Sequence, residues 1–355
     1  MSMLNWKEKF PPLVIVAGVV IGVVAAALVK FGNPPNMGLC MACFERDIAG
    51  ALGLHRANVV QYLRPELFGI VLGAALAAMF GRELVSRSGS SPAVRFFLGV
   101  FVMIGALVFL GCPIRMVLRL GGGDCNALVG LAGFVAGIAI GTVFLKRGAF
   151  LGTSRKENWG GTLWVMPLLA VGGIALVIAA PLFVFFSEKG PGSMRAPVVV
   201  SLGAGLLLGV LGQRSRMCFV GGIRDMILFR SSQLLIGFVA VLIGAFVANM
   251  MLGLFHPGFE NQPIAHSDHL WNFLSMGLVG LGSVLLGGCP CRQLVLASQG
   301  NGDSIVAVFG MVVGAAIAHN FGLAASPSGV PAAGMIAVSA GMATCLAIGL
   351  TAREK

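Results

Sequence analysis

Long apolar runs constrain this chain more than any other feature of its sequence. Residues 163–186, 234–254 and 305–318 carry few or no charges, and each is long enough, or nearly so, to cross about 30 Å of hydrocarbon. Only 10% of the residues are charged, against roughly 25% in a soluble domain. Run 13–29 is too long for the apolar core of a secretory signal, so it is predicted to be a retained helix. The sequence therefore predicts a polytopic membrane protein.

Ten such runs alternate with four segments that are neither spans nor ordinary polar loops. The spans are predicted near residues 13–29, 66–80, 94–111, 126–145, 163–186, 197–212, 233–254, 270–287, 304–319 and 331–351. The four other segments are 38–55, 111–124, 215–230 and 287–303. Each is too short to cross and return, and irregular backbone at depth needs a protein or water surrounding. We therefore expect an all-α fold of about ten spans with four re-entrant half-helices.

Two of these segments share the pattern Gly-Cys-Pro-x-Arg, at residues 111–115 and 288–292. A proline just inside a helix start wastes no hydrogen bond and presets the backbone angle. Each copy is therefore expected to be a short helix that presents a thiol at its N-terminus, with an arginine one turn further on. Because a helix N-terminus favours anions, we expect these two ends to face each other inside the membrane.

The chain is internally duplicated. Cys218 follows Cys43 by 175 residues, and Cys289 follows Cys112 by 177 residues, about half the chain in each case. We assign residues 1–150 to a first repeat, 151–192 to a linker with an extra span, and 193–355 to a second repeat with a terminal span. Because the extra span crosses the membrane once more, the second repeat begins on the opposite side of the membrane from the first. The repeats are therefore expected to be inverted, which is typical of transporters.

Basic residues are distributed unevenly between the two faces. The face that holds the N-terminus collects 16 of the 24 Lys and Arg residues: Lys7, Lys9, Arg82, Arg87, Arg95, Lys146, Arg147, Arg155, Lys156, Arg214, Arg216, Arg224, Arg230, Arg292, Arg353 and Lys355. Positive loops mark the cytoplasmic side, so both termini are expected in the cytoplasm. The net charge of +11 reflects this bias. With a single Tyr and no basic run interleaved with aromatics, nucleic-acid binding is not expected.

Four thiols recur at matched places: Cys43, Cys112, Cys218 and Cys289. Inversion would stack them along one axis, one pair entering from each face. A thiol is a weak donor and a soft acceptor, suited to polarisable sulfur or selenium. A file of largely protonated thiols would bind a soft anion weakly at several places, as conduction requires. The other cysteines are expected only to pack: Cys40, Cys125, Cys291 and Cys345.

Four arginines accompany these thiols: Arg46, Arg115, Arg224 and Arg292. A charged side chain in lipid is costly. Arg115 and Arg292 therefore either face the cavity or pair with Asp124 and Asp303. The same choice applies to Arg46 beside Asp47 and to Arg224 beside Asp225. Structural ion pairs and direct attraction of an anion are both open.

The main rival chemistry uses the pair Cys40 and Cys43, whose spacing resembles half of a zinc or redox site. A second Cys-x-x-Cys is missing, and the chain has no phosphate-binding or dinucleotide-binding glycine loop. We therefore expect no metal, no cofactor and no enzymatic activity. The alternative is a membrane thiol–disulfide oxidoreductase that uses Cys40 and Cys43.

On these motifs the chain resembles the YeeE/YedE family of bacterial inner-membrane sulfur transporters, and within it the YedE branch of selenium transporters. The matching residues are 40–47 (Cys-Met-Ala-Cys-Phe-Glu-Arg-Asp), 111–115 (Gly-Cys-Pro-Ile-Arg), 217–219 (Met-Cys-Phe) and 288–292 (Gly-Cys-Pro-Cys-Arg). The resemblance implies uptake of a soft sulfur anion such as thiosulfate, or of a selenium analogue, through an hourglass-shaped interior. It also implies relay past Cys43, Cys112, Cys218 and Cys289, and a small cytoplasmic TusA-like sulfur carrier as partner.

Overall fold

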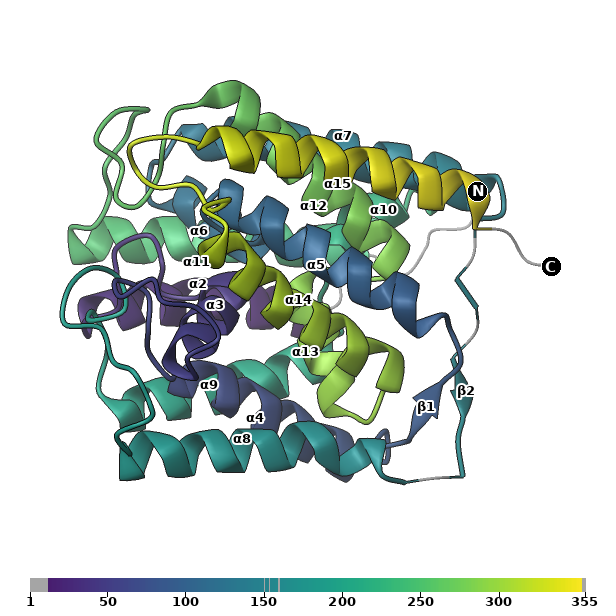
Figure 1. Cartoon of the computed structure of the whole chain (residues 1–355), viewed down its shortest axis with the longest axis horizontal. Helices are drawn as coiled ribbons and strands as arrows, with labels where there is room; N and C mark the ends of the chain where they lie inside the picture. Colours follow the sequence, from purple (N-terminus) through teal and green to yellow (C-terminus); the bar gives the residue numbers. More distant parts are fainter. Residues whose placement is uncertain (1–11, 150, 153, 159, 353–355) are drawn as a thin grey trace.

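The computed structural model describes residues 12–149, 151–152, 154–158 and 160–352, and within them the chain is almost entirely helical (Figure 1). The long helices are α2 (Pro12–Lys30), α4 (Pro65–Phe80), α5 (Pro92–Val108), α7 (Asn126–Lys146), α8 (Thr162–Ala179), α9 (Val198–Ser215), α11 (Gln233–Leu252), α12 (His269–Leu286), α14 (Gly302–Asn320) and α15 (Ala332–Thr351). Each coincides with one predicted span. Nine stretches of the described residues are long and apolar enough to cross a membrane, and α4 is a shorter apolar helix. The prediction of an all-α polytopic membrane protein is confirmed.

Four short helices lie at the four segments predicted to be half-helices: α3 (Met41–Ala51), α6 (Pro113–Gly121), α10 (Phe219–Phe229) and α13 (Pro290–Ser298). Pro113 and Pro290 occupy the first turns of α6 and α13, where the missing N–H has no intrahelical partner to lose. Most residues of α3, α6 and α13 are buried. Their polar backbone ends are therefore surrounded by protein.

Long helices from the two halves of the chain pack in exchanged pairs. Helix α2 packs on α11, and α4 packs on α9; likewise α5 packs on α14, and α7 packs on α12. The first helix of each predicted repeat thus packs on the third helix of the other repeat. In the same way, the fourth helix of each repeat packs on the sixth helix of the other. The pairing is the one that two repeats related by a two-fold axis require, and the division of the chain into inverted repeats stays a prediction.

Glycines set the close approach of α4 and α9. A Cβ atom on Gly73 would lie 2.2 Å from the carbonyl oxygen of Leu206, and one on Gly209 would lie 2.2 Å from that of Ile70. No real side chain tolerates that distance, so both positions need glycine. In lipid, where burial gives little drive, such backbone contacts hold helices together.

The extra span is shorter than predicted. Helix α8 ends at Ala179 instead of continuing to residue 186, and Ala180 adopts a left-handed conformation. Pro181 explains the end, because a proline disfavours helical backbone in the residue before it. The following residues form a loop, in which the Phe185 N–H donates to the carbonyl of Ala51. Run 163–186 is therefore a helix and a docked loop.

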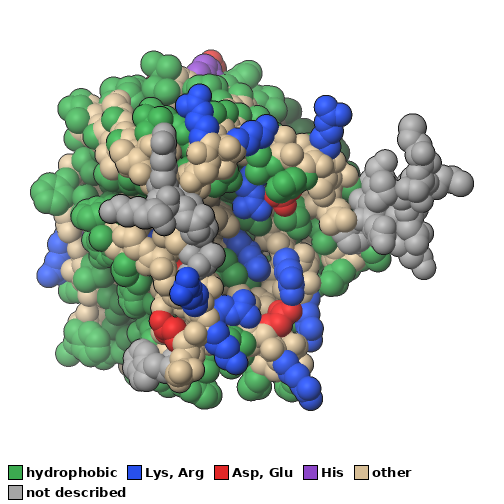
Figure 2. All heavy atoms as spheres, turned by 90° about the vertical axis from the view of Figure 1, so that its right-hand side faces the viewer, with side chains coloured by type: hydrophobic (Ala, Val, Ile, Leu, Met, Phe, Trp, Pro, Cys, Tyr) green, Lys and Arg blue, Asp and Glu red, His purple; other side chains and the backbone are tan. Residues whose placement is uncertain are grey.

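One end of the molecule is rich in Lys and Arg (Figure 2). It holds the short strands β1 (Arg87–Ser88) and β2 (Arg155–Lys156), which pair antiparallel, and helix α15 ends there (Figure 1). The distribution of basic residues among the loops predicts that this face is cytoplasmic. Four of the residues counted there lie outside the described residues: Lys7, Lys9, Arg353 and Lys355.

Candidate functional site

The first thiol cluster forms where the N-termini of α3 and α6 meet. Cys40 is the N-cap of α3, and its Sγ accepts a hydrogen bond of 3.3 Å from the Cys43 N–H. Cys112 is the N-cap of α6 and lies within hydrogen-bonding reach of Cys40. All three cysteines are buried. We call Cys40, Cys43 and Cys112 the first cluster.

Arg115 directs its charge at this cluster. Its Nη1 donates to Cys43 Sγ at 3.2 Å, while Nε and Nη2 donate to the carbonyls of Asn36 and Ile264. The residue is fully buried and makes no ion pair among the described residues. The expected alternative, a pair with Asp124, is wrong, because Arg119 takes that carboxylate at 2.6 Å. Arg115 thus places a buried positive charge beside the thiols, and no carboxylate among the described residues pairs with it.

The second cluster repeats this arrangement with α10 and α13. Cys218 is the N-cap of α10, and its Sγ accepts from the Gly221 N–H at 3.3 Å. Cys289 is the N-cap of α13, and the two sulfur atoms lie 3.9 Å apart. Both residues are buried. We call Cys218 and Cys289 the second cluster.

Arg292 is the counterpart of Arg115. It lies within electrostatic range of Cys218 and Cys289, and its buried Nη1 has no hydrogen-bond partner among the described residues. It does not pair with Asp303, whose Oδ1 accepts from two backbone N–H groups and whose nearest cation is Arg95 at 3.9 Å. The alternative of an Arg292–Asp303 ion pair is therefore also wrong.

The structural correspondence between α3 and α10 differs from the correspondence that the Cys-Phe dipeptides suggest in the sequence. Cys40 and Cys218 are both N-caps with extended backbone (φ −158° and −146°), and both accept from the N–H three residues on. The sequence match of Cys43 with Cys218 is therefore off by three residues, and the position of Cys43 is filled by Gly221. In the corrected register Arg46 coincides with Arg224.

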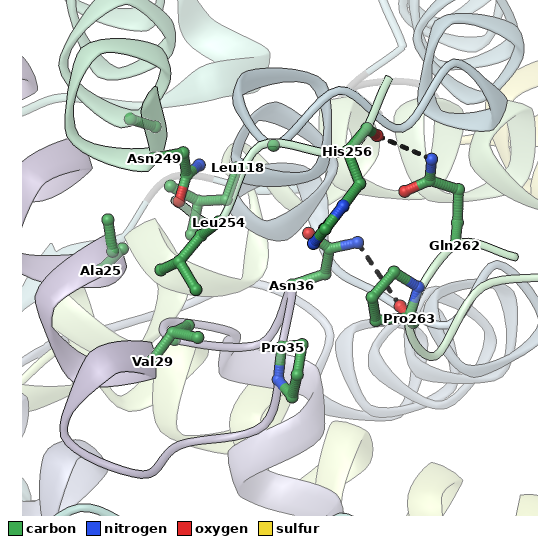
Figure 3. Close-up of a pocket in the computed structure, with 14 residues that line it drawn as sticks. Ala25, Val29, Pro35, Asn36, Leu118, Asn249, Leu254, His256, Gln262 and Pro263 are labelled. Atoms are coloured by element: carbon green, nitrogen blue, oxygen red, sulfur yellow. Dashed lines mark hydrogen bonds between the residues drawn. The ribbon is translucent and has the colours of Figure 1, made fainter. Parts of the chain in front are cut away.

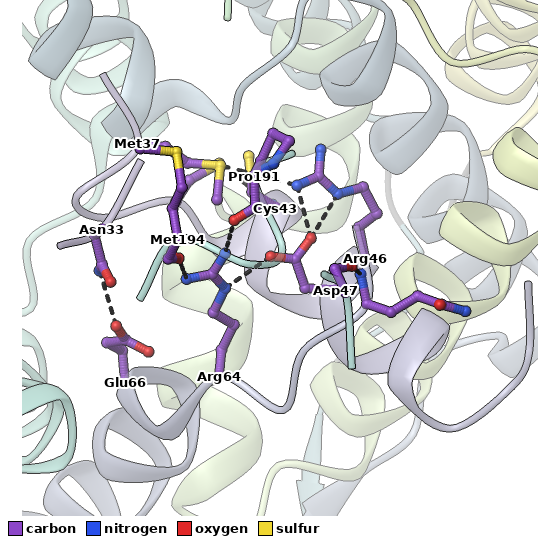
Figure 4. Close-up of polar contacts among 12 residues, drawn as sticks. Asn33, Met37, Cys43, Arg46, Asp47, Arg64, Glu66, Pro191 and Met194 are labelled. Carbon is purple, nitrogen blue, oxygen red and sulfur yellow. Dashed lines mark hydrogen bonds and ion pairs between the residues drawn. The ribbon is translucent and has the colours of Figure 1, made fainter. Parts of the chain in front are cut away.

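Arg46 and Arg224 make local ion pairs. Arg46 donates to Asp47 at 2.7 Å, and Arg224 donates to Asp225 at 2.8 Å. Asp47 also receives Arg64 at 2.7 Å, which in turn donates to backbone carbonyls of the loop after α8 (Figure 4). Of the two possibilities left open by the sequence, the structure favours ion pairing for Arg46 and Arg224.

A small cavity of about 140 Å³ lies between α2, α11 and the loop after α11, at the end of the molecule opposite β1 and β2 (Figure 1). Polar side chains of Asn36, Asn249, His256 and Gln262 line it (Figure 3). The backbone carbonyl of Asn36 accepts from Arg115, so one residue lines the cavity and also holds the arginine. We call this space the outer pocket.

The profile of the sulphur transport family matches residues 214–351. This part of the chain is therefore similar to members of that family. The match supports the resemblance to YeeE/YedE proteins over these residues, and the assignment to the YedE branch stays a prediction. Thiosulfate transporter TsuA of Escherichia coli (strain K12) is 30% identical over 125 residues, which are 35% of this chain and 35% of the relative. The matched region thus spans about a third of that protein.

The family segment runs from the end of α9 through α15 and contains the second cluster with Arg292. The first cluster lies outside the matched residues. Its similarity to the second cluster therefore rests on the geometry of this chain. Each half presents paired helix N-termini, N-cap thiols and an arginine that forms no ion pair within the part of the chain that the structure describes.

The sequence alone does not identify Cys40 as part of the site or Arg119 as the partner of Asp124. At the sequence offset of 175 residues Cys40 has no cysteine counterpart in the second half, and it gains one, Cys218, only in the register that the two N-caps show. The expected partner of Asp124 is Arg115, yet Asp124 follows Arg119 by only five residues, and its N–H donates to the Arg119 carbonyl. That short spacing was the available signal.

Proposed function

We propose that this chain is a permease that carries a soft sulfur anion such as thiosulfate, or its selenium analogue, across the bacterial inner membrane. The observation that carries the proposal is the repeated cluster: two helix N-termini, buried thiols at their caps, and an arginine that pairs with no carboxylate of the residues described. Each helix N-terminus stabilises a nearby anion by about 0.3–1 kcal/mol. Two termini and a desolvated arginine therefore attract an anion at each cluster.

The thiols supply the selectivity. A neutral thiol is a weak hydrogen-bond donor that matches the terminal sulfur of thiosulfate, or selenium, better than the hard oxygens of sulfate. Weak binding at two successive clusters also suits conduction, which fails when one site holds its ion too tightly. The anion enters at the outer pocket, passes the first cluster, which includes Cys40 alongside Cys43 and Cys112, and leaves past Cys218 and Cys289.

The proposal includes the orientation and the partner. Residues 1–150 and 193–355 form inverted repeats around the linker 151–192, and both termini lie in the cytoplasm. The anion leaves at the basic face, where a small acidic or sulfur-carrying protein of the TusA kind receives it. The bias of Lys and Arg towards that face supports this orientation.

The test is uptake by purified protein in liposomes, with thiosulfate, sulfate and selenosulfate offered separately. We expect thiosulfate or selenosulfate to enter and sulfate to be excluded. Cys112→Ala and Cys289→Ala should abolish uptake, whereas the matched control Cys345→Ala, a buried cysteine of α15, should not. Equal entry of sulfate, or normal uptake by both cluster variants, would end the proposal.

The alternative of a thiol–disulfide oxidoreductase is distinguished in the same preparation. That activity requires a disulfide involving Cys40 or Cys43 that forms and breaks during turnover. Mass spectrometry of alkylated protein, quenched during thiosulfate uptake, measures it. Permeation predicts that all eight cysteines stay reduced throughout.

A further inference from the structure

Glu45 is a buried acid whose oxygens have no partner. It lies on α3, two residues after Cys43, with 2% of its surface exposed. Neither carboxylate oxygen has a hydrogen-bond partner among the described residues. Asp47, on the same helix, is held by two arginines. A buried polar group without a partner is rare and needs an explanation, and inside a membrane protein it marks function by default.

Glu45 lies between the short helices that carry one thiol of each cluster. Glu45 belongs to the helix that carries the first cluster, and it lies within electrostatic range of Cys291 on α13, the helix that Cys289 caps. Helices α3 and α13 are in direct contact. The acid therefore lies near the contact between α3, which carries Cys43, and α13, which Cys289 caps.

The surroundings of Glu45 are apolar. It lines a cavity of about 570 Å³ between α3, α4, α8, α13 and α14, whose other lining residues are hydrophobic or glycine. Leu294 of α13 and Val308 of α14 are examples. An ionised carboxylate among these apolar side chains has no cation of the described residues paired with it, so the neutral acid is favoured.

Charged and titratable groups on the surrounding helices are engaged elsewhere. Arg46 pairs with Asp47, Arg292 lies beside the second cluster, and His319 stacks on His55. Glu66 of α4 accepts from Asn33 and Ser201. Arg95 of α5 and Asp303 of α14 face each other.

Helix α8, which also borders the cavity, has no charged residue. Within the described residues no cation forms an ion pair with Glu45.

We propose that Glu45 carries a proton with the anion, so that uptake is proton-coupled; this inference rests on the function proposed above. The neutral acid donates its O–H to the anion as the anion passes from the first cluster to the second. Departure of the anion towards the basic face lets the proton leave for water on that side. The ionised carboxylate then repels the next anion until a proton from the outer face neutralises it. Proton and anion thus cross together, and no bond other than O–H forms or breaks.

The experiment uses the full chain in liposomes that contain a pH-sensitive dye, with thiosulfate added outside. Wild-type uptake should acidify the lumen and accelerate several-fold when the lumen is made one pH unit more alkaline. Glu45→Gln keeps a neutral hydrogen-bonding group but carries no proton, so it should transport thiosulfate downhill without acidification and without a response to the gradient. Glu66→Gln, a buried acid with hydrogen-bond partners, is the matched control and should behave as wild type.

The wild-type dye signal decides the matter even if Glu45→Gln does not fold. Thiosulfate uptake without acidification would overturn the proton-coupling proposal and leave the permease intact, and so would acidification that persists in folded Glu45→Gln. Absence of thiosulfate uptake by wild-type protein would instead overturn the proposed function itself, and the coupling with it.

Discussion

The sulfur atoms of Cys218 and Cys289 lie 3.9 Å apart, although the two residues are 71 positions apart in the chain. Each caps a short helix, α10 or α13, so the contact joins two helix N-termini. A chain that only packed its cysteines would have no reason to bring two positive helix ends together, because like partial charges repel. An anion between them removes that repulsion.

Oxidation should close this path. A disulfide needs an S–S distance of about 2.05 Å, so a small approach of α10 and α13 suffices to join Cys218 and Cys289. We expect diamide to lower thiosulfate uptake at least about tenfold, equivalent to about 1.4 kcal/mol on the barrier, and a reductant to restore it. The measurement is uptake together with the mass of the cross-linked peptide.

Cys218→Ser supplies the control for this oxidation. It cannot form the disulfide, so its remaining uptake should resist diamide. Inhibition of Cys218→Ser to the same extent as wild type would show that another thiol is responsible.

Cys40 should matter as much as Cys218. Both side chains accept from the N–H three residues on and cap their helices. Cys40→Ala removes the cap of α3, which costs about 0.5–2 kcal/mol, and also removes a thiol from the first cluster. We expect lower thermal stability and a loss of uptake, while Cys40→Ser should recover the stability but not the uptake. Full uptake by Cys40→Ser would show that Cys40 is only a cap.

The sequence predicted the spans and half-helices because their signals are local. Apolar runs mark the long helices, and Pro113 and Pro290 mark the starts of two short ones. The register of the repeats was harder to predict, because the Cys-Phe dipeptides at residues 43–44 and 218–219 suggest that Cys43 corresponds to Cys218. In the structure it is Cys40 that has the extended backbone of an N-cap residue, as Cys218 does. The missing partners of Glu45 are a property of the packed helices and leave no trace in the sequence.

Two arginines of α6 should differ in what their loss does. Arg119 and Asp124 form an ion pair of 2.6 Å with both side chains fully buried. Arg119→Gln leaves Asp124 as an unpaired buried charge, at a cost of about 3–5 kcal/mol, and should lower the unfolding temperature markedly. Arg115→Lys keeps a positive charge near Cys43 but cannot make all three of the arginine's hydrogen bonds. It should reduce uptake per folded molecule with a smaller loss of stability.

Thermal unfolding of the purified variants, measured beside uptake normalised to folded protein, separates the two effects. Wild-type uptake by Arg115→Lys would contradict the assignment of Arg115 to the anion path. An unfolding temperature of Arg119→Gln equal to that of wild type would contradict the structural role of Arg119.

His266 gives the loop between α11 and α12 a dependence on pH. Burial lowers the pKa of His266 below its ordinary value of 6.5. Its Nε2 is 2.8 Å from the carbonyl oxygen of Val108, and its Nδ1 accepts from the Asp268 N–H, so the ring is neutral with the proton on Nε2. Because the unfolded chain binds the proton more readily, this stabilisation is complete above pH 6.5 and is lost as the pH falls through 6.5 towards the pKa of the folded state.

The unfolding temperature should therefore fall more between pH 7.5 and 5.5 for wild type than for His266→Gln, whose amide can still donate to Val108 but does not titrate. Other histidines lower the unfolding temperature of both proteins, so the test is the difference between the decrease for wild type and the decrease for His266→Gln. Equal decreases would contradict the role given to His266.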